Sequence, residues 1–328
     1  TRAFLSIVTL LIVCFIVFSL MELVPGTCAE RYLAFKNTQG SQITFEDIAA
    51  EEKRLGLDKP FLYRYTKWVS DIVIKQDFGD SCILRISINE LLSGRFVLSL
   101  TIAITALLFS YAIAIPVGII SATTKYASLD NALKFVSYLG IALPNFLVAL
   151  CIMLFMTVYY GDTMTGLFSQ EYENAPWSSA KVQDFLSRAW LPIFVLGWNA
   201  TAFALQTVRA LMLDENDKLY VMAARARGVS GMSLLWRYPA KHSLGPVINS
   251  IGFDLNRIFS ALPVVALILI LTEAGALLIE ALARSNDQQL AGAIIFLLTA
   301  TIVFVNFVTD IILAIMDPRI RRGVMGGS

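Results

Sequence analysis

The stretch FVLSLTIAITALLFSYAIAIPVGIISA, residues Phe96–Ala122, contains no charged side chain. A helix needs about 20 apolar residues to cross the hydrocarbon core of a bilayer, so this stretch is long enough to span a membrane. Five other stretches meet the same requirement, namely Ala3–Val24, Phe135–Tyr160, Trp190–Met212, Leu244–Leu271 and Leu290–Met316. The sequence therefore predicts an all-α polytopic membrane protein with six transmembrane helices.

The composition of the whole chain agrees with this fold class. Hydrophobic residues make up 57% of the 328 residues and charged residues only 16%. A water-soluble domain of this length would expose too much apolar surface to stay dispersed. The single His and the four Cys form no C-x-x-C pair and no His cluster, so no metal site is expected. The net charge of +1 gives no indication of a nucleic-acid partner, and none is expected.

The loops between the predicted helices alternate in the sign of their charge. The segment Arg209–Lys241 carries six basic side chains against three acidic ones, whereas Gly161–Ser187 carries four acids and one Lys. Short loops rich in Lys and Arg remain in the cytoplasm. The alternation predicts that both termini are cytoplasmic, which leaves Pro25–Arg95 on the external, periplasmic side.

The external segment Pro25–Arg95 is too long for a simple connection. It contains enough aromatic residues to pack, so we expect a small external domain, with a plain linker as the alternative. Cys28 and Cys82 both fall in this segment and could form a disulfide in an oxidising compartment. The expected organisation is a first transmembrane helix (1–24), the external domain (25–95), a five-helix core (96–322) that includes the cytoplasmic loop 213–243, and a tail (323–328).

The cytoplasmic loop LDENDKLYVMAARARGVSGMSLLWRYPAKHSLGPVIN, residues Leu213–Asn249, predicts two short helices. Gly228 can end the first helix, and Ser230 can cap the second. Pro239 interrupts the second helix. Ala223 and Ala224 put small residues on one face of the first helix, which suits docking into a groove on another protein. A solvated basic loop that only anchors the topology is the alternative.

Several motifs in this loop and elsewhere resemble one known family. YVMAARARGVS (220–230) resembles the EAA loop of ABC importer permeases, with Ala223, Ala224 and Gly228 at the matching positions. LGLDKP (55–60), DFGDS (77–81) and DPRIR (317–321) are similar to further motifs of the oligopeptide branch. The chain thus resembles permease subunits of the dipeptide/oligopeptide (binding-protein-dependent, type I) ABC importers. It departs from the EAA pattern at two positions. Met222 occupies the position of the acidic residue of the motif, and Gly245 occupies a position where Leu is usual.

The resemblance implies a non-catalytic transport subunit of the bacterial inner membrane. It implies an ATPase-coupling loop formed by Tyr220, Ala223, Ala224, Arg225, Arg227, Gly228, Val229 and Ser230. No phosphate-binding G-x-x-x-x-G-K-[ST] loop occurs in the sequence, so this chain is expected to bind no cofactor. ATP and Mg would bind to partner ATPase subunits. The implied partners are a second homologous permease subunit, two ABC ATPase subunits, a periplasmic substrate-binding protein and membrane lipid.

Two charged residues fall inside the fifth predicted span. Asp254 and Arg257 are three positions apart and can pair on one helical face. Isolated charges are costly inside a membrane, so they should face the bundle or a wet cavity. They either line the translocation path, lock a subunit interface or form a structural intrahelical pair. Weaker candidates for the path are Asn199, Gln206 and Asn256.

The transported solute is the least determined feature of the sequence. Peptide is the favoured substrate class on the resemblance, with oligosaccharide or opine as the alternative. An ATP-independent secondary transporter or channel would explain the apolar helices but not the paired short helices around Gly228. A membrane-embedded enzyme lacks support because the spans contain no H-E-x-x-H motif and no catalytic pairing.

Overall fold

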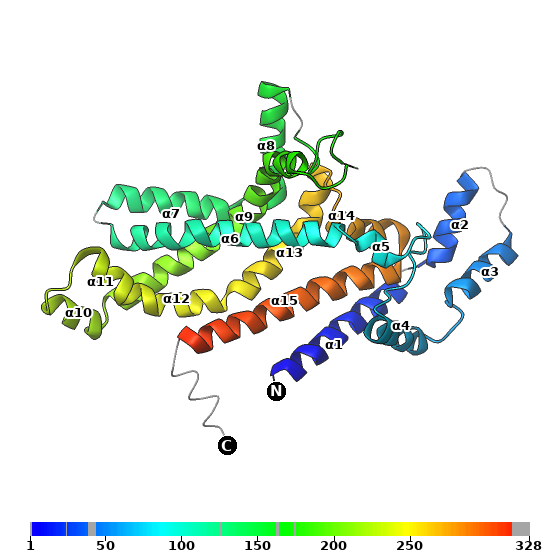
Figure 1. Ribbon diagram of the computed structural model, residues 1–328, viewed down its shortest axis with the longest axis horizontal. Helices are drawn as coiled ribbons and strands as arrows, with labels where there is room; N and C mark the ends of the chain where they lie inside the picture. Colours follow the sequence, from blue (N-terminus) through cyan, green and yellow to red (C-terminus); the bar gives the residue numbers. More distant parts are fainter. Residues whose placement is uncertain are drawn as a thin grey trace, which may run out of the picture. The chain divides into compact units, whose positions relative to one another are not determined.

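The computed structural model describes residues 2–23, 25–38, 44–124, 126–161, 164–173 and 175–316. The predicted tail (323–328), the end of the predicted core and the DPRIR motif (317–321) lie outside these residues. The part of the chain that is described consists of helices and loops, with a single isolated antiparallel bridge between Asp80 and Ser87. Figure 1 shows the helices along the chain.

The chain divides into two compact units, each built from two separate stretches of sequence. Unit 1 comprises Thr1–Ser99 and Thr272–Thr301, and unit 2 comprises Leu100–Leu271 and Ile302–Ser328. The helices that belong to or begin in unit 1 are α1 (Arg2–Glu22), α2 (Cys28–Thr38), α3 (Phe45–Leu55), α4 (Phe61–Lys75), α5 (Ile88–Leu92), α6 (Arg95–Thr123), α14 (Ala274–Ile279), the π-helix η1 (Glu280–Ser285) and α15 (Gln288–Met316). The helices within unit 2 are α7 (Ala127–Ala142), α8 (Asn145–Tyr160), α9 (Ser179–Asn216), α10 (Leu219–Ala226), α11 (Gly231–Arg237), α12 (Pro239–Asn249) and α13 (Ile251–Leu269).

Four helical segments are long and apolar enough to cross a membrane, and they are Ile88–Thr123, Ser179–Asn216, Ile251–Leu269 and Gln288–Leu313. The pair α7 and α8 would add a fifth span if it counts as one broken helix. The apolar part of α1, Ile7–Glu22, is shorter than the length required of a membrane-spanning helix. The described residues therefore support four or five spans, and the sixth remains a prediction.

Two of the predicted spans are broken rather than continuous. The stretch Phe135–Tyr160 forms α7 and α8, which are bent by 102° at Leu143–Pro144. Proline disfavours the helical conformation of the residue before it and donates no backbone hydrogen bond, so the helix stops there. The stretch Leu244–Leu271 is divided at Ser250 between α12 and α13. Apolar composition marks such segments, but it does not show where the helix axis turns.

Helix α9 begins earlier than its apolar composition indicates. The predicted span starts at Trp190, whereas α9 starts at Ser179. Ser178 is the N-cap, and its side-chain oxygen accepts a hydrogen bond from the backbone amide of Lys181. Lys181, in the first turn of α9, is buried and donates hydrogen bonds to the carbonyls of Glu173 and Ala175. Its ammonium group also lies over the ring of Phe168. A Lys whose donors are satisfied in this way can be buried in the first turn of a long helix.

The core of unit 1 brings the start of the chain next to the first half of α15. Phe18 of α1 packs on Trp68 of α4 with ring centroids 4.7 Å apart, and Trp68 meets Phe296 of α15 edge to face. The ring of Phe18 also lies against Gly292, where a Cβ atom would come within 2.4 Å of it. The predicted external segment 25–95 is therefore part of a larger unit that includes α1 and residues of 272–301.

Two buried carboxylates tie loops of unit 1 together. Asp287 accepts hydrogen bonds from the hydroxyl of Ser81 at 2.7 Å and from the backbone amide of Cys82 at 2.8 Å. Glu273 accepts from the amides of Gly275 and Ala276 at the start of α14. Burial raises the pKa of both carboxyls, and the hydrogen bonds they accept oppose that change. Buried carboxyls with full sets of donors hold these loops in one conformation.

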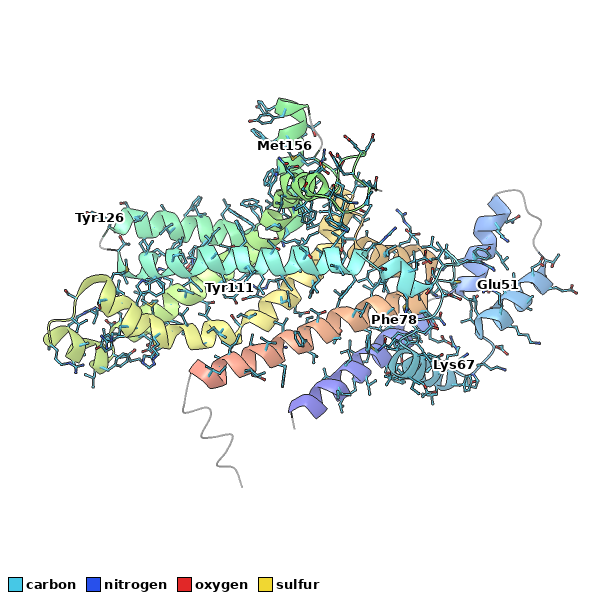
Figure 2. The ribbon with its side chains drawn as sticks, in the orientation of Figure 1. Glu51, Lys67, Phe78, Tyr111, Tyr126 and Met156 are labelled. Carbon is cyan, nitrogen blue, oxygen red and sulfur yellow. A yellow bond between two sulfur atoms is a disulfide. The ribbon has the colours of Figure 1, made fainter. Side chains whose placement is uncertain are left out.

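The packing of unit 2 depends on small residues at helix contacts. At Gly118 of α6 a Cβ atom would lie 2.8 Å from Val208 of α9, and at Gly140 of α7 it would lie 2.8 Å from Ala202. Close approach of this kind is how helices associate where lipid gives no hydrophobic driving force. The carboxylate of Asp130 joins α7 to Arg209 of α9 through a two-pronged pair at 2.9 Å. Figure 2 draws the described side chains over the ribbon.

Cys28 and Cys82 are joined by a disulfide that closes a loop of 54 residues in unit 1. Replacing both by Ser should lower the free energy of unfolding by about 4 kcal/mol, because the cross-link restricts the unfolded chain. The check is the thermal unfolding midpoint of the purified chain in detergent, with and without reductant. Reductant should lower the midpoint of the wild type but not that of the double variant.

The matched control for this experiment is Cys151→Ser, because Cys151 is an exposed free thiol. Its midpoint should equal that of the wild type, and reductant should lower both alike. An unchanged midpoint in the Cys28/Cys82 double variant would contradict a stabilising role for the disulfide.

Candidate functional site

The loop between α9 and α12 forms two short helices that meet at Gly228. α10 ends at Ala226, and Gly228 has φ +89°, a left-handed conformation that residues with a Cβ rarely adopt. This turn lets the amide of Val229 bond to the carbonyl of Ala224 at 3.1 Å. The hydrogen bond satisfies a helix-end carbonyl and turns the chain toward α11. Figure 1 shows α10 and α11 together at one end of unit 2.

The two short helices enclose a small core of their own. Val221 and Ala224 are fully buried against Leu234 of α11. Ala224 was expected on the docking face; in the structure its side chain is buried in the cluster with Leu234, so its place in the coupling loop stays a prediction. Ala223 and Gly228 are exposed. The period of the helix places both alanines near one face, but only tertiary packing shows which one is covered.

The loop is fastened to its neighbours by polar side chains. The hydroxyl of Tyr220 donates to Glu215 at 2.5 Å, and the Tyr220 ring meets His242 of α12 edge to face. Burial, together with the bond to Glu215, raises the pKa of the Tyr220 hydroxyl. Arg225 donates to the amide oxygen of Asn216 at 2.7 Å. These contacts join α10 to the end of α9 and to α12.

The outer surface of the loop carries apolar side chains that sequence reasoning did not single out. Leu219 is 80% exposed, and Met222, Met232 and Trp236 are also exposed. Arg227 is exposed beside them, whereas Ser230 occupies the cap position of α11 without a side-chain hydrogen bond. Exposed apolar groups rimmed by charge mark protein interaction sites. The available signal was the presence of Leu, Met and Trp in an otherwise polar loop.

The second candidate site is a polar cluster where α6 meets α12 and α13. The carboxylate of Asp254 is buried and accepts a hydrogen bond from Tyr111 of α6 at 2.5 Å. It lies 3.5 Å from Arg257 and 3.3 Å from the hydroxyl of Ser250. The predicted pair of Asp254 and Arg257 is therefore present, and Tyr111 is a partner that the sequence did not indicate. Figure 2 places Tyr111 along the middle part of α6.

Arg257 connects this cluster to α9. Its guanidinium lies 3.7 Å above the ring of Phe203 and 4.9 Å from the ring of Phe253. The guanidinium nitrogen Nη1 is buried and is the atom that forms the ion pair with Asp254, although it makes no hydrogen bond within the described part of the chain. A cation placed over aromatic rings is stabilised by their quadrupoles without being neutralised. Arg257 thus joins Asp254 to the aromatic rings at the contact of α9 and α13.

The weaker path candidates are not gathered at this cluster. Asn199 donates to the carbonyl of Gly140 in α7 at 3.2 Å. Gln206 has a buried amide nitrogen without a hydrogen-bond partner among the described residues, and Asn256 is exposed. The described residues also contain no group of three or more His, Cys, Asp or Glu side chains placed to hold a metal. The described residues therefore provide two features, the exposed surface of α10 and α11 and the polar cluster around Asp254.

Comparison with known proteins identifies the type of protein that shares these features. The family model described as "Binding-protein-dependent transport system inner membrane component" matches residues 114–322, and its N-terminal companion matches 1–87. The oligopeptide transport system permease protein AppB of Bacillus subtilis is 28% identical over 98% of each chain. The inner membrane ABC transporter permease protein YejB of Escherichia coli O157:H7 is 30% identical over 84% of this chain and 76% of that protein.

A solved structure shares the fold of this chain. It is an inward-facing conformation of the MetNI methionine ABC transporter, with a TM-score of 0.55 and 16% identity. The match covers 69% of this chain and 96% of that chain. At this level of identity the similarity concerns the fold alone.

Replacing Tyr111 by Phe should destabilise unit 2. The change removes the hydroxyl that bonds to buried Asp254, at a cost of about 1.5–3 kcal/mol for a hydrogen bond to a charged group. The measurement is thermal unfolding of the purified protein in nanodiscs. Tyr126→Phe is the matched control, because Tyr126 is 73% exposed at the turn between α6 and α7. Equal midpoints for the two variants would show that the Tyr111 bond contributes nothing.

Proposed function

The chain belongs to the family of inner-membrane components of binding-protein-dependent transport systems, and on this basis we propose that it carries peptides. It is a multi-pass protein of the bacterial inner membrane and a permease subunit of an ABC importer. Curated relatives that match nearly the full length are named as oligopeptide or peptide permeases. Their names and full-length similarity are the observation that supports a peptide substrate.

The proposed topology has six spans with both termini in the cytoplasm. The charge alternation of the loops supports it, since Arg209–Lys241 is basic and Gly161–Ser187 is acidic. The disulfide between Cys28 and Cys82 fits an external location for residues 25–95, because such bonds persist in oxidising compartments. Outside the membrane, the proposed partner is a periplasmic substrate-binding protein. Within the membrane, the proposed partner is a second homologous permease subunit, with which this chain would form a heterodimer.

The loop at α10 and α11 is the proposed attachment site for an ABC ATPase subunit. Exposed Met232 and Trp236 would enter a groove on the ATPase, and Arg227 would pair with its acidic rim. Aromatic anchors of this kind carry most of the energy of protein interfaces. ATP and Mg would be bound by the ATPase subunits, and this chain would contribute no catalytic residue.

The proposed transmission of force follows the contacts of unit 2. The loop is bonded to α9 through Glu215 and Asn216, and it meets α12 at His242. α12 leads into α13, which carries Asp254 and Arg257. A push on the loop would therefore reach the polar cluster through these packed helices. The cluster would lie on the translocation path or at the contact with the second permease subunit.

Replacing Gly228 by Val should release the ATPase subunits. Valine is strained at φ +89°, so the turn between α10 and α11 would change and the docking surface with it. Co-purification of ATPase subunits with the tagged permease is the readout. The matched control is Gly56→Val, since Gly56 has φ +70° and, like Gly228, no atom near its Cβ position. Loss of ATPase in both variants would indicate general misfolding rather than a specific effect.

Replacing Trp236 by Ser should weaken ATPase binding by about tenfold or more, the effect expected when an aromatic anchor is removed. The readout is the concentration of ATPase needed for half-maximal assembly on nanodiscs. Phe45→Ser is the control, because Phe45 is 91% exposed but lies in α3. If Trp236→Ser assembled as well as the control, the proposed docking surface would be wrong.

The transported substrate needs a separate test. Proteoliposomes that contain the whole importer and its binding protein should take up labelled peptide when ATP is supplied. Uptake of maltotriose in place of peptide would overturn the peptide assignment and leave the family membership intact.

A further inference from the structure

Helix α4 packs against the middle of α1 rather than beyond its end. The hydroxyl of Tyr65 donates to the backbone carbonyl of Leu11 at 2.7 Å, and Phe61 meets Phe15 edge to face with ring centroids 5.5 Å apart. Leu11 precedes Glu22, the last residue of α1, by 11 residues, which corresponds to roughly 16 Å along the helix axis. Tyr65 therefore reaches far along a helix that is proposed to span the membrane, and Figure 1 shows α4 beside the second half of α1.

The neighbouring residue, Arg64, reaches along α1 in the opposite direction. Its guanidinium lies 2.5 Å from the carboxylate of Glu22 and 3.1 Å from the side-chain oxygen of Gln288, the first residue of α15. The backbone of α4 at Arg64 and Tyr65 therefore lies between the levels of Leu11 and Glu22, within the length of α1. Long basic side chains extend in this way from apolar surroundings to the polar edge of a membrane.

The contact of α4 with α15 indicates a similar depth. The ring of Trp68 meets Phe296 edge to face, with centroids 6.2 Å apart. The candidate span Gln288–Leu313 has 26 residues and is roughly 39 Å long, about 9 Å more than a hydrocarbon core of about 30 Å. Phe296 lies roughly 12 Å from Gln288 along the axis, so it is inside the core even when all of the excess projects outward. Trp68 and α4 are therefore level with the outer leaflet.

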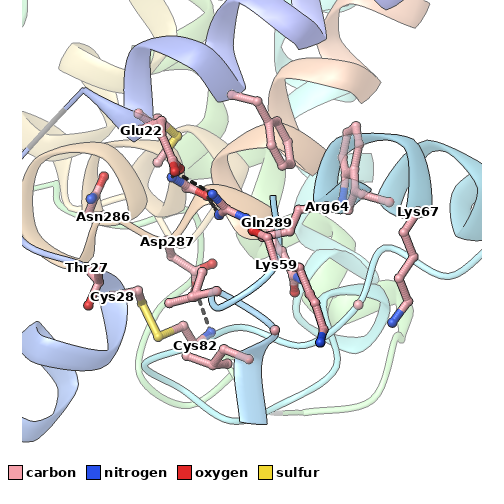
Figure 3. Close-up of a pocket in the computed structure, with 18 of the residues that line it drawn as sticks. Glu22, Thr27, Cys28, Lys59, Arg64, Lys67, Cys82, Asn286, Asp287 and Gln289 are labelled. Atoms are coloured by element: carbon pink, nitrogen blue, oxygen red, sulfur yellow. Dashed lines mark hydrogen bonds and ion pairs between the residues drawn. A yellow bond between two sulfur atoms is a disulfide. The ribbon is translucent and has the colours of Figure 1, made fainter. Parts of the chain in front are cut away.

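The two flanks of α4 differ in polarity. On one flank, Arg64, Lys67 and Asp71 line a cavity of about 840 Å³ together with further charged residues of unit 1 (Figure 3). On the other flank, Val69 and Val73 line a groove of about 90 Å³. The α1 side of this groove is formed by apolar residues, namely Ile7, Leu10, Leu11 and Cys14. A helix with one charged flank and one apolar flank is suited to lie in the plane of a membrane surface.

The apolar flank of α4 continues the apolar surface of α1. Leu62 and Val73 are exposed on α4, and Ile7 is exposed on α1. Ile7 and Val73 line the same groove, so the two exposed surfaces are contiguous. Thr66 lies on the same flank, but its hydroxyl donates to the carbonyl of Leu62 at 2.8 Å and so needs no partner from outside the helix.

We propose that α4 lies in the outer leaflet of the membrane, with lipid acyl chains against Leu62, Val69 and Val73 and in the groove that α4 forms with α1. The inference rests on the proposed topology, in which α1 spans the membrane and Glu22 marks its external end. No charged side chain is among the described residues that line the groove, whereas interfaces between proteins carry a polar rim. Acyl chains require only an apolar surface at this depth. The predicted external domain is thereby anchored in the bilayer through α4.

The test uses two pairs of adjacent positions on α4 with similar exposure. Val73 is 71% exposed and Ile74 is 76% exposed, and Leu62 and Tyr63 are 62% and 55% exposed. The first residue of each pair lies on the apolar flank. The second lies on the charged flank, because Tyr63 lines the large cavity and Ile74 follows Lys67 by two helical turns.

The variants Val73→Cys, Ile74→Cys, Leu62→Cys and Tyr63→Cys would each carry a nitroxide label in the assembled transporter in nanodiscs. Cys151→Ser is the background, because Cys151 is an exposed free thiol. Electron paramagnetic resonance measures how often the label collides with oxygen, which concentrates in hydrocarbon, and with a water-soluble nickel chelate. The ratio of oxygen to chelate collisions should be several-fold higher at position 73 than at 74, and at 62 than at 63. Two pairs keep the test valid if one variant fails to fold.

Equal ratios within both pairs would overturn the proposal, because α4 would then meet water on both flanks. A label at position 73 that neither oxygen nor the chelate reaches would also overturn it, because a second protein would then cover the apolar flank.

The topology is checked separately with Phe45→Cys in the same background, because Phe45 is 91% exposed in α3. A membrane-impermeant maleimide should label this variant in right-side-out membrane vesicles. External labelling together with equal ratios on α4 rejects this inference alone. Labelling only after the vesicles are opened rejects the proposed topology itself.

Discussion

The structure depends on the need to satisfy every backbone polar group where lipid supplies no hydrogen-bond partner. Long helices meet this need along their length, and each break must be compensated locally. At Pro144 the break coincides with a residue that has no amide to satisfy. At Ser250 the side chain donates to the carbonyl of Val247 and thereby occupies an acceptor at the helix end. The positions of the breaks therefore follow from local chemistry, and they determine where the chain can turn.

The same requirement governs the charged groups that are buried. Asp254 has Tyr111 as a donor, and Asp287 has Ser81 and the backbone of Cys82. Removing a donor from such a group leaves an uncompensated acceptor, which costs more than the bond itself contributes. Asn286 is different because its side-chain oxygen, Oδ1, is buried without a hydrogen-bond partner among the described residues.

The loop at Gly228 shows how a soluble surface is attached to helices in a membrane. Its core of Val221, Ala224 and Leu234 keeps the two short helices rigid, and Tyr220 fastens them to α9. In the proposed coupling, this rigidity would let the loop transmit a displacement, and exposed Trp236 would be the contact for the ATPase. The motif residues are therefore divided between two tasks. Some build the loop, as Ala224 does, and others remain at its surface, as Ala223 and Arg227 do.

The sequence by itself determined the fold class, the membrane location and the family resemblance, because hydropathy, loop charge and motif spacing are local properties. It also indicated the pairing of Asp254 with Arg257, which are three residues apart on one helix. Only the tertiary structure decided by what angle α7 and α8 are bent, that Ala224 is covered, and that Tyr111 reaches Asp254. Ser81 and Asp287 are separated by 206 positions, and no local pattern marks such a pair. Contacts of this kind arise from the packing of whole helices, so they become visible only when the chain is folded.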